Sequence, residues 1–282
     1  MTKRPIGVFD SGVGGLSVLR AVRAELPRED LLYVADSGHA PYGERSEDFI
    51  LERVKQITAF MRSRRVKAVV SACNTATMVA LQWLRNHLEI PVVAIEPMLQ
   101  PAIERTRSGR VGVLATRVTL MSEGFSSLLV RHQDQAEFFL QPCPRFVELV
   151  ERGALDGPET RQAIRDYIEP LFRQGVDTLV LGCTHFPFLI PIIQEIAGPE
   201  VAVIEPSRAL ARELRLRLTD SRLLTDKPEP GATFFWTSGE PRQVEPVISR
   251  LWGAKVQVQA LPQRYAIPPD VNRTAHSTPN RS

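Results

Sequence analysis

The chain has 282 residues, of which 43% are hydrophobic, so it is long enough to bury one large core or two modest ones. Its 35 basic and 32 acidic residues nearly balance and form no block of one sign, which argues against nucleic acid or a membrane surface as a partner. No window approaches the roughly 18 apolar residues of a membrane span, and the first residues lack a signal-peptide core, so we expect a cytoplasmic protein.

Short runs of Val, Ile and Leu alternate with longer amphipathic stretches, a pattern typical of βα units that feed a buried parallel sheet. The predicted strands, in chain order, lie in "PIGVFDSG", "LLYVADSG", "KAVVSAC", "PVVAIEP", "RVGVLATR", "EFFLQPC", "DTLVLGC", "VAVIEPS" and "ATFFWTSG". Helices are predicted over Gly15–Leu26, Glu47–Arg64, Thr75–Leu88, Pro158–Gln174 and Ser207–Leu218. Residues 262–282 are rich in Pro, Asn, Arg and Ser, and we expect them to form a disordered tail.

Part of the sequence recurs about 105 to 110 residues later. "GVFDSGVGGL" resembles "GVLATRVTLM", and "VKAVVSACNT" resembles "VDTLVLGCTH" with Cys73 aligned on Cys183. "VVAIEP" and "AVIEP" follow in the same order. The repeat predicts two similar α/β domains with mostly parallel sheets, related by pseudo-two-fold symmetry, with the active site in the cleft between them.

The two aligned cysteines stand at the carboxyl ends of equivalent strands, where parallel sheets bind their ligands. A thiol has an ordinary pKa of about 8.5 and can exchange protons near neutral pH. Two thiols on opposite sides of one carbon can therefore remove a proton from one face and return it to the other, which inverts a stereocentre. A single cysteine would more often serve packing, but packing gives no reason for both Cys73 and Cys183 to precede a polar pair.

The third cysteine, Cys143, lacks this context and is interpreted as structural. Three cysteines are an odd number and show no C-x-x-C spacing, so a disulfide framework and a structural zinc site are both disfavoured.

The turn "DSGVGGLS" partly matches a dinucleotide-binding motif. Gly12 and Gly14 fit, but Ser17 replaces the third glycine and Asp10 would place negative charge near a pyrophosphate. We therefore interpret this segment as a tight strand-to-helix turn that lets the backbone approach a small ligand.

Two alternatives stay open on the residues alone. His185 follows Cys183 closely, as in a Cys–His hydrolase, although such an enzyme would give Cys73 no role. An α/β module that binds a nucleotide or an anion without chemistry would make both cysteines dispensable.

The segments "GVFDSGVGGLSVL", "YVADSGHAPYGERS", "SACNTAT", "PVVAIEP", "GVLATRVT", "PCPRFVELVE" and "LGCTHFPFL" together resemble glutamate racemases, in the cofactor-independent aspartate/glutamate racemase superfamily. The resemblance implies interconversion of L- and D-glutamate without pyridoxal phosphate or metal, supplying D-glutamate for peptidoglycan in a bacterium. It also implies a homodimer. A racemase of aspartate or a related acid in the same superfamily is the alternative.

The same resemblance implies roles for individual residues. Cys73 would remove the α-proton of D-glutamate with help from Asp10. Cys183 would remove that of L-glutamate with help from Glu151 and His185. The residues implied to hold the substrate's amino and carboxylate groups are Asp10, Ser11, Tyr42, Gly43, Asn74, Thr75, Thr116, Thr119, Thr184 and His185.

The resemblance further implies the division of the chain. Residues 1–97 with 207–261 would form the first domain, and residues 98–206 the second. One departure from the family pattern is Glu205-Pro206, where an Asp-Ser type of sequence is expected, but this change touches no implied catalytic position.

Overall fold

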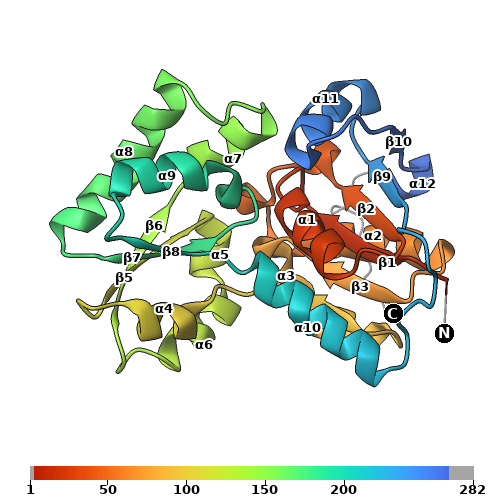
Figure 1. Ribbon diagram of the computed structural model, residues 1–282, viewed down its shortest axis with the longest axis horizontal. Coiled ribbons are helices and arrows are strands. Elements are labelled where there is room, and N and C mark those ends of the chain that lie inside the picture. The colour runs from red at the N-terminus through yellow and green to blue at the C-terminus, as the bar shows by residue number, and fades with distance from the viewer. Residues whose placement is uncertain (1–2, 267–282) are drawn as a thin grey trace, which may run out of the picture.

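The computed structural model describes residues 3–266, which form two α/β domains, each built on a parallel sheet (Figure 1). The strand order is β10-β9-β2-β1-β3-β4 in the first sheet and β6-β5-β7-β8 in the second. Every neighbouring pair is parallel. The strands are β1 (Ile6–Asp10), β2 (Leu31–Ala35), β3 (Ala68–Ser71), β4 (Val92–Ala94), β5 (Arg110–Ala115), β6 (Glu137–Pro142), β7 (Thr178–Gly182), β8 (Ala202–Ile204), β9 (Thr233–Thr237) and β10 (Val258–Ala260).

The repeat predicted from the sequence is confirmed by the strand order. The run β2-β1-β3-β4 of the first sheet has the same order as β6-β5-β7-β8 of the second. Each predicted strand is present, and β10 is the strand that the sequence pattern missed, because its three residues carry too short an apolar run. The division of the chain at residues 97/98 and 206/207 stays a prediction.

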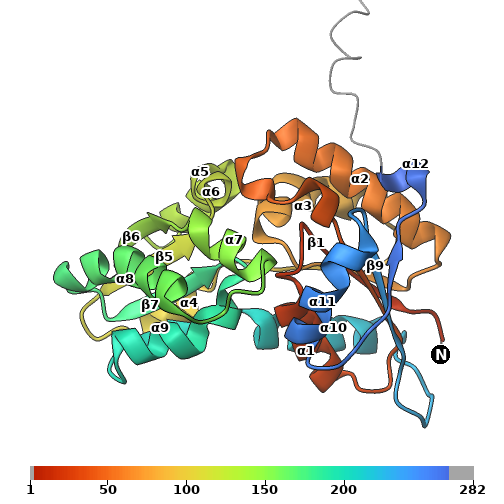
Figure 2. The ribbon, with the colours of Figure 1, turned by 90° about the horizontal axis from the view of Figure 1, so that it is seen from above.

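Helices cover both faces of each sheet. Figure 2 shows α2 and α3 on one face of the first sheet and α1 and α10 on the other. The helices are α1 (Leu16–Glu25), α2 (Glu47–Ser63), α3 (Asn74–His87), α4 (Leu99–Arg105), α5 (Arg117–Met121), α6 (Glu123–Val130), α7 (Pro144–Glu151), α8 (Pro158–Arg173), α9 (Ile190–Ala197), α10 (Ser207–Asp220), α11 (Pro241–Trp252) and α12 (Gln263–Ala266), with 3₁₀ turns η1 (Ser37–His39), η2 (Tyr42–Glu44) and η3 (Phe186–Leu189). The five predicted helices match α1, α2, α3, α8 and α10 to within two residues at each end. None of the helices between residues 3 and 266 is long and apolar enough to cross a membrane.

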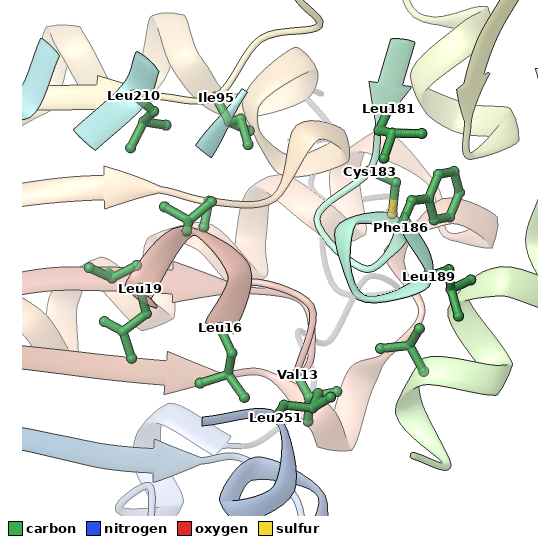
Figure 3. Close-up of a cluster of buried hydrophobic side chains, with 14 of the residues drawn as sticks. Val13, Leu16, Leu19, Ile95, Leu181, Cys183, Phe186, Leu189, Leu210 and Leu251 are labelled. Atoms are coloured by element: carbon green, nitrogen blue, oxygen red, sulfur yellow. The ribbon is translucent and has the colours of Figure 1, made fainter. Parts of the chain in front are cut away.

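One hydrophobic cluster continues from the first domain into the second. It contains Val13 of the turn before α1 and Leu16, the first residue of α1, together with Phe186 and Leu189 of η3. Part of the cluster is drawn in Figure 3. Cys183 belongs to the same cluster. The contact between the domains therefore has an apolar core next to one of the two predicted thiols.

The C-terminal part of the described chain is more ordered than predicted. Residues Gln263–Ala266 form α12, and the Tyr265 ring packs edge-on against Phe60 with 5.6 Å between ring centroids. The predicted start of the tail at residue 262 is therefore too early in the chain, because Tyr265 packs against an aromatic residue of α2. Residues 267–282 lie outside the described part of the chain, and the prediction for them stays untested.

The unusual Glu205-Pro206 pair lies between β8 and α10. The Glu205 carboxylate accepts a hydrogen bond from the Ser207 backbone N–H at 2.9 Å. Glutamate at this position therefore binds one of the free amides of the α10 N-terminus, as an aspartate or serine cap would.

A buried ion pair at the amino-terminal end of the first sheet generates a stability prediction. Lys67 pairs with Glu29, both side chains are at most 3% exposed, and Lys67 Nζ also donates to the Leu223 carbonyl. Lys67→Met leaves the Glu29 charge buried, so we expect the free energy of unfolding to fall by roughly 3–5 kcal/mol in urea denaturation. The matched control is Lys55→Met, which breaks the half-exposed pair with Glu52 and should cost less than about 1 kcal/mol. Equal losses in the two variants would contradict the assignment.

Candidate active site

The predicted site residues meet at the carboxyl ends of the central strands of both sheets, around a closed cavity of about 10 Å³. This cavity is lined by Ser11, Pro41, Tyr42, Gly43, Cys73, Asn74, Thr75, Thr116, Val147, Cys183, Thr184 and His185. All of them except Pro41 and Val147 were predicted from the sequence. The three other predicted residues lie behind the lining and bond to it: Asp10 to Thr184, Glu151 to His185, and Thr119 to Thr75.

Cys73 caps α3. Its sulfur accepts a hydrogen bond from the Ala76 backbone N–H at 3.4 Å and lies 3.6 Å from Ser11 Oγ. Burial, and after it the nearby Asp10 carboxylate, raises the pKa of Cys73 to about 12. The ordinary pKa assumed from the sequence is therefore wrong for this closed cavity, because desolvation outweighs the helix N-terminus. At neutral pH the Cys73 side chain is a thiol.

Cys183 has a basic neighbour. Its sulfur lies 3.6 Å from His185 Nδ1, and His185 Nε2 lies 2.7 Å from Glu151 Oε1. Burial lowers the pKa of His185, but its hydrogen bonds with Cys183 and Glu151 outweigh burial and raise that pKa well above the ordinary value. The ring is then an imidazolium that donates to sulfur on one side and to carboxylate on the other. A cation in this place stabilises negative charge that develops on Cys183.

Asp10 ends β1 and is fully buried between the domains. Its Oδ2 accepts from the Gly12 backbone N–H at 3.0 Å, and its Oδ1 accepts from Thr184 Oγ1 at 2.9 Å. Burial raises the pKa of Asp10, while the positive charge of His185 opposes that rise. The carboxylate thus links the strand end of the first domain to the polar pair beside Cys183.

The turn after β1 is glycine-rich because side chains of the second domain pack directly on its backbone. A Cβ at Gly12 would lie 1.9 Å from Glu151 Oε1, and a Cβ at Gly14 would lie 2.3 Å from His185 Nδ1. These glycines were interpreted as making room for a small ligand. In the structure they make room for Glu151 and His185, and the Val13 N–H between them donates to Glu151 Oε1 at 2.8 Å.

A hydroxyl cluster joins the domains on the other side of the cavity. Thr75 Oγ1 lies 3.0 Å from Thr116 Oγ1 and 3.1 Å from Thr119 Oγ1, and the last two lie 2.9 Å apart. The side-chain amide of Asn74, also in the lining, is buried with neither its nitrogen nor its oxygen bonded to another described residue. A buried, unbonded amide is costly, so Asn74 marks a place where a polar ligand group would be stabilised.

Sequence reasoning missed the residues that hold Tyr42 in place, next to Gly43 in the cavity lining. The Tyr42 hydroxyl donates a hydrogen bond to Asp36, which also forms a two-point ion pair with the fully buried Arg53. Although burial opposes it, hydrogen bonds from His39 and Arg53 hold the pKa of Asp36 well below its usual range. Asp36 comes directly after β2, much as Asp10 ends β1, and that similarity was the available signal. Arg53 on α2 gave none, since an arginine on a helix is usually solvated.

The donor set around the cavity is suited to an acidic, zwitterionic small molecule. Hydroxyls, one free amide and a histidine offer hydrogen bonds to carboxylate groups, and Asp10 offers a negative partner for an ammonium group. Within residues 3–266, no group of three or more His, Cys, Asp and Glu side chains is placed to hold a metal ion.

Comparison with known proteins shows which family the chain resembles. Residues 7–214 match the sequence profile of the Asp/Glu/Hydantoin racemase family. A glutamate racemase of Methylococcus capsulatus is 48% identical over 94% of this chain and 97% of its own length. The crystal structure of the glutamate racemase isoform RacE1 from Bacillus anthracis superposes with a TM-score of 0.84 at 32% identity, covering 92% of this chain and 98% of that one. The crystal structure of Escherichia coli glutamate racemase, solved with L-glutamate and the activator UDP-MurNAc-Ala, superposes with a TM-score of 0.81 at 32% identity and covers the same shares of the two chains.

The raised pKa of His185 can be measured directly. Because the folded value lies above the unfolded value of about 6.5, protonation of His185 stabilises the fold fully below that pH, and this stabilisation is lost as the pH rises through the folded pKa. We expect ring NMR signals, assigned with His185→Gln, to titrate well above pH 6.5.

Gly14→Ala should move this titration back toward the ordinary value, because its methyl group displaces the ring from Glu151 and Cys183. The control Gly124→Ala adds a methyl group on α6, whose nearest neighbour is the flexible Met78 side chain, and should leave the titration unchanged. A wild-type His185 that titrates near 6.5 would contradict the assignment.

Proposed function

The chain belongs to the Asp/Glu/Hydantoin racemase family and groups with its glutamate racemases, which makes it an isomerase, and we propose that it interconverts L- and D-glutamate. Cys73 and Cys183 exchange the α-proton on opposite faces of the substrate, and neither pyridoxal phosphate nor a metal ion takes part. The reaction runs in the cytoplasm of a bacterium, in a homodimer, and the D-glutamate formed supplies peptidoglycan synthesis. The resemblance to glutamate racemases supports these last assignments.

One observation carries the proposal: the two thiols come from equivalent strands of the two domains and line the same cavity. A proton removed by one thiol can be replaced from the other only if the α-carbon lies between them. A Cys–His hydrolase needs one thiol and would leave Cys73 unused. A ligand-binding module without chemistry needs neither.

The electrostatic difference between the thiols supports separate roles. Cys73 would remove the α-proton of D-glutamate, and Cys183, beside the His185 imidazolium, that of L-glutamate. The closed cavity keeps Cys73 protonated, first by burial and then through the charge of Asp10. An ammonium group of the substrate placed near Asp10 compensates this negative charge, so substrate binding itself makes the Cys73 thiolate more accessible.

Stabilisation of the deprotonated α-carbon requires fixed hydrogen-bond donors, because no electron sink is proposed. The unbonded amide of Asn74 and the hydroxyls of Thr75, Thr116, Thr119 and Thr184 surround the cavity and are proposed to hold the substrate carboxylates. In a closed, dry site such donors act more strongly than in water. Ser11, Tyr42, Gly43 and His185 complete the proposed substrate contacts. A cavity of about 10 Å³ holds at most about one water molecule, so the domains must separate to admit an amino acid.

Replacement of each cysteine tests the two-thiol mechanism. Cys73→Ala and Cys183→Ala should each lower the kcat for racemisation, followed by circular dichroism of both glutamate enantiomers, by about a hundred- to ten-thousand-fold or more. In deuterated water the wild-type product should carry deuterium at the α-carbon. Cys143→Ala is the matched control, because Cys143 is equally buried but lies outside the cavity, and it should retain activity. Full activity in either cavity variant would overturn the mechanism.

The same assay separates the proposed substrate from its alternative. L- and D-aspartate should be turned over far more slowly than the glutamate enantiomers. Faster turnover of aspartate, or of a related acid, would assign the chain to another branch of the family, with the same thiol chemistry.

The raised pKa of Cys73 predicts the pH dependence of its alkylation. In a Cys143→Ala/Cys183→Ala variant, Cys73 is the one remaining cysteine, and its iodoacetamide reaction without substrate depends on the thiolate fraction. With a pKa of about 12, the rate should rise about tenfold per pH unit from pH 7 to 10 without a plateau. A plateau near pH 9 would show an ordinary thiol and contradict the role assigned to burial.

A further inference from the structure

The peptide group between Gly12 and Val13 is held from both of its ends. The Tyr33 hydroxyl donates to the Gly12 carbonyl oxygen at 2.7 Å, and the Val13 N–H donates to Glu151 Oε1 at 2.8 Å. A carbonyl and the following N–H belong to one planar unit, so a hydrogen bond that fixes the carbonyl also fixes the direction of the N–H. Tyr33 of the first domain thereby determines where Glu151 of the second domain is bound.

Tyr33 is rigidly held. It lies in the middle of β2, paired in register with Val8 of β1 and Phe235 of β9. Its ring packs edge-on against the Phe235 ring, with 6.3 Å between the ring centroids. The side chain is fully buried, and the Gly15 backbone N–H gives its hydroxyl a second hydrogen bond. A tyrosine hydroxyl that joins two points of the glycine turn restricts the turn more than ring packing alone would.

The hydroxyl stays a donor over the working pH range. Burial, followed by the charges of Asp10 and Glu151, raises the pKa of Tyr33 well above its ordinary value. The phenol therefore keeps its proton for the Gly12 carbonyl, and ordinary pH changes do not switch this contact off.

From Glu151 the hydrogen bonds continue to the thiol. The oxygen that accepts from the Val13 N–H is the same Oε1 that lies 2.7 Å from His185 Nε2, and His185 Nδ1 lies 3.6 Å from Cys183 Sγ. The order is thus Tyr33, the 12–13 peptide, Glu151, His185 and Cys183. Asp10 also bonds this turn, through the Gly12 N–H, but has a separate anchor in Thr184.

We propose that Tyr33 is a positioning residue for Cys183: its hydroxyl fixes the 12–13 peptide, which binds Glu151 and so orients the His185 ring against the sulfur. This role rests on the two-thiol racemisation proposed above. A role in packing alone would make Tyr33 a residue of stability, with no influence on the His185 ring.

Tyr33→Phe removes the hydroxyl and keeps the ring. We expect kcat/KM to fall about tenfold for both enantiomers, the loss of one hydrogen bond of about 1.4 kcal/mol expressed as a rate. The fall must be equal in the two directions because the enantiomers have equal free energy in water. In the absence of substrate, the NMR titration of His185 should move toward its ordinary pH.

Thr58→Val is the matched control, since it removes another buried hydroxyl of the first domain, which bonds the Val54 carbonyl within α2. It should change neither kcat/KM by more than about twofold nor the His185 titration. A Tyr33→Phe protein whose His185 titrates as in wild type would overturn the inference, whatever its activity.

A double-mutant cycle with Glu151→Gln tests the route. If Tyr33 acts through Glu151, Tyr33→Phe should cost much less in a protein that already carries Glu151→Gln than in the wild type. Strictly additive losses in kcat/KM would overturn the proposed route.

If Tyr33→Phe does not fold, 3-fluorotyrosine at position 33 keeps the hydroxyl and makes it a stronger donor. The inference then requires a shifted His185 titration, and an unchanged one would overturn it. Because this readout needs no substrate, it separates the inference from the proposed function. Racemisation can survive an unmoved His185 signal, and a moved signal can be seen even if the cysteine variants remain active.

Discussion

The site depends on direct contact between charged side chains of the second domain and the backbone of the first. Glu151 and His185 pack so closely on the turn that a Cβ at Gly12 or Gly14 would clash with them. Glu151 is also held there by a hydrogen bond from the Val13 N–H. The same Glu151 oxygen lies 2.7 Å from His185 Nε2, and His185 Nδ1 lies 3.6 Å from Cys183 Sγ. Separation of the domains would therefore open the site and also break the hydrogen bonds between the first domain and the Cys183 half, from the Val13 N–H to Glu151 and from Thr184 to Asp10.

The two thiols are equivalent in the repeat but not in their electrostatics. Cys73 lies near a carboxylate and is kept neutral by burial, whereas Cys183 lies against an imidazolium. The proposed reaction is symmetric, since its substrate and product are mirror images of equal free energy. The proposed mechanism therefore requires comparable proton transfer on both faces from unlike surroundings, and it assigns to the charges of a bound zwitterion the task of lowering the pKa of Cys73.

The sequence predicts the parts of the structure that depend on local pattern. Strand positions follow from apolar runs, and the repeat by itself aligns Cys73 with Cys183. Tyr33 and Arg53 could not be found this way, because a tyrosine within a strand and an arginine within a helix are ordinary, and their partners Gly12 and Asp36 are distant in the chain. The pKa of Cys73 could not be found either, since burial is set by the packing of both domains.

The repeat also shows at which equivalent positions the two halves of the site carry different side chains. Its alignment places His185 on Thr75 and Thr119 on Gly14. In the structure these four residues form two contacts across the domain interface: His185 packs against Gly14, and Thr75 Oγ1 lies 3.1 Å from Thr119 Oγ1.

The two interface contacts are therefore equivalent in the repeat. In one of them a large histidine side chain packs against a glycine, and in the other two threonine hydroxyls meet. A Cβ at position 14 would displace the histidine, because the interface there is closely packed. Equivalent positions of the repeat thus carry an imidazolium beside Cys183 and part of a hydroxyl cluster after Cys73.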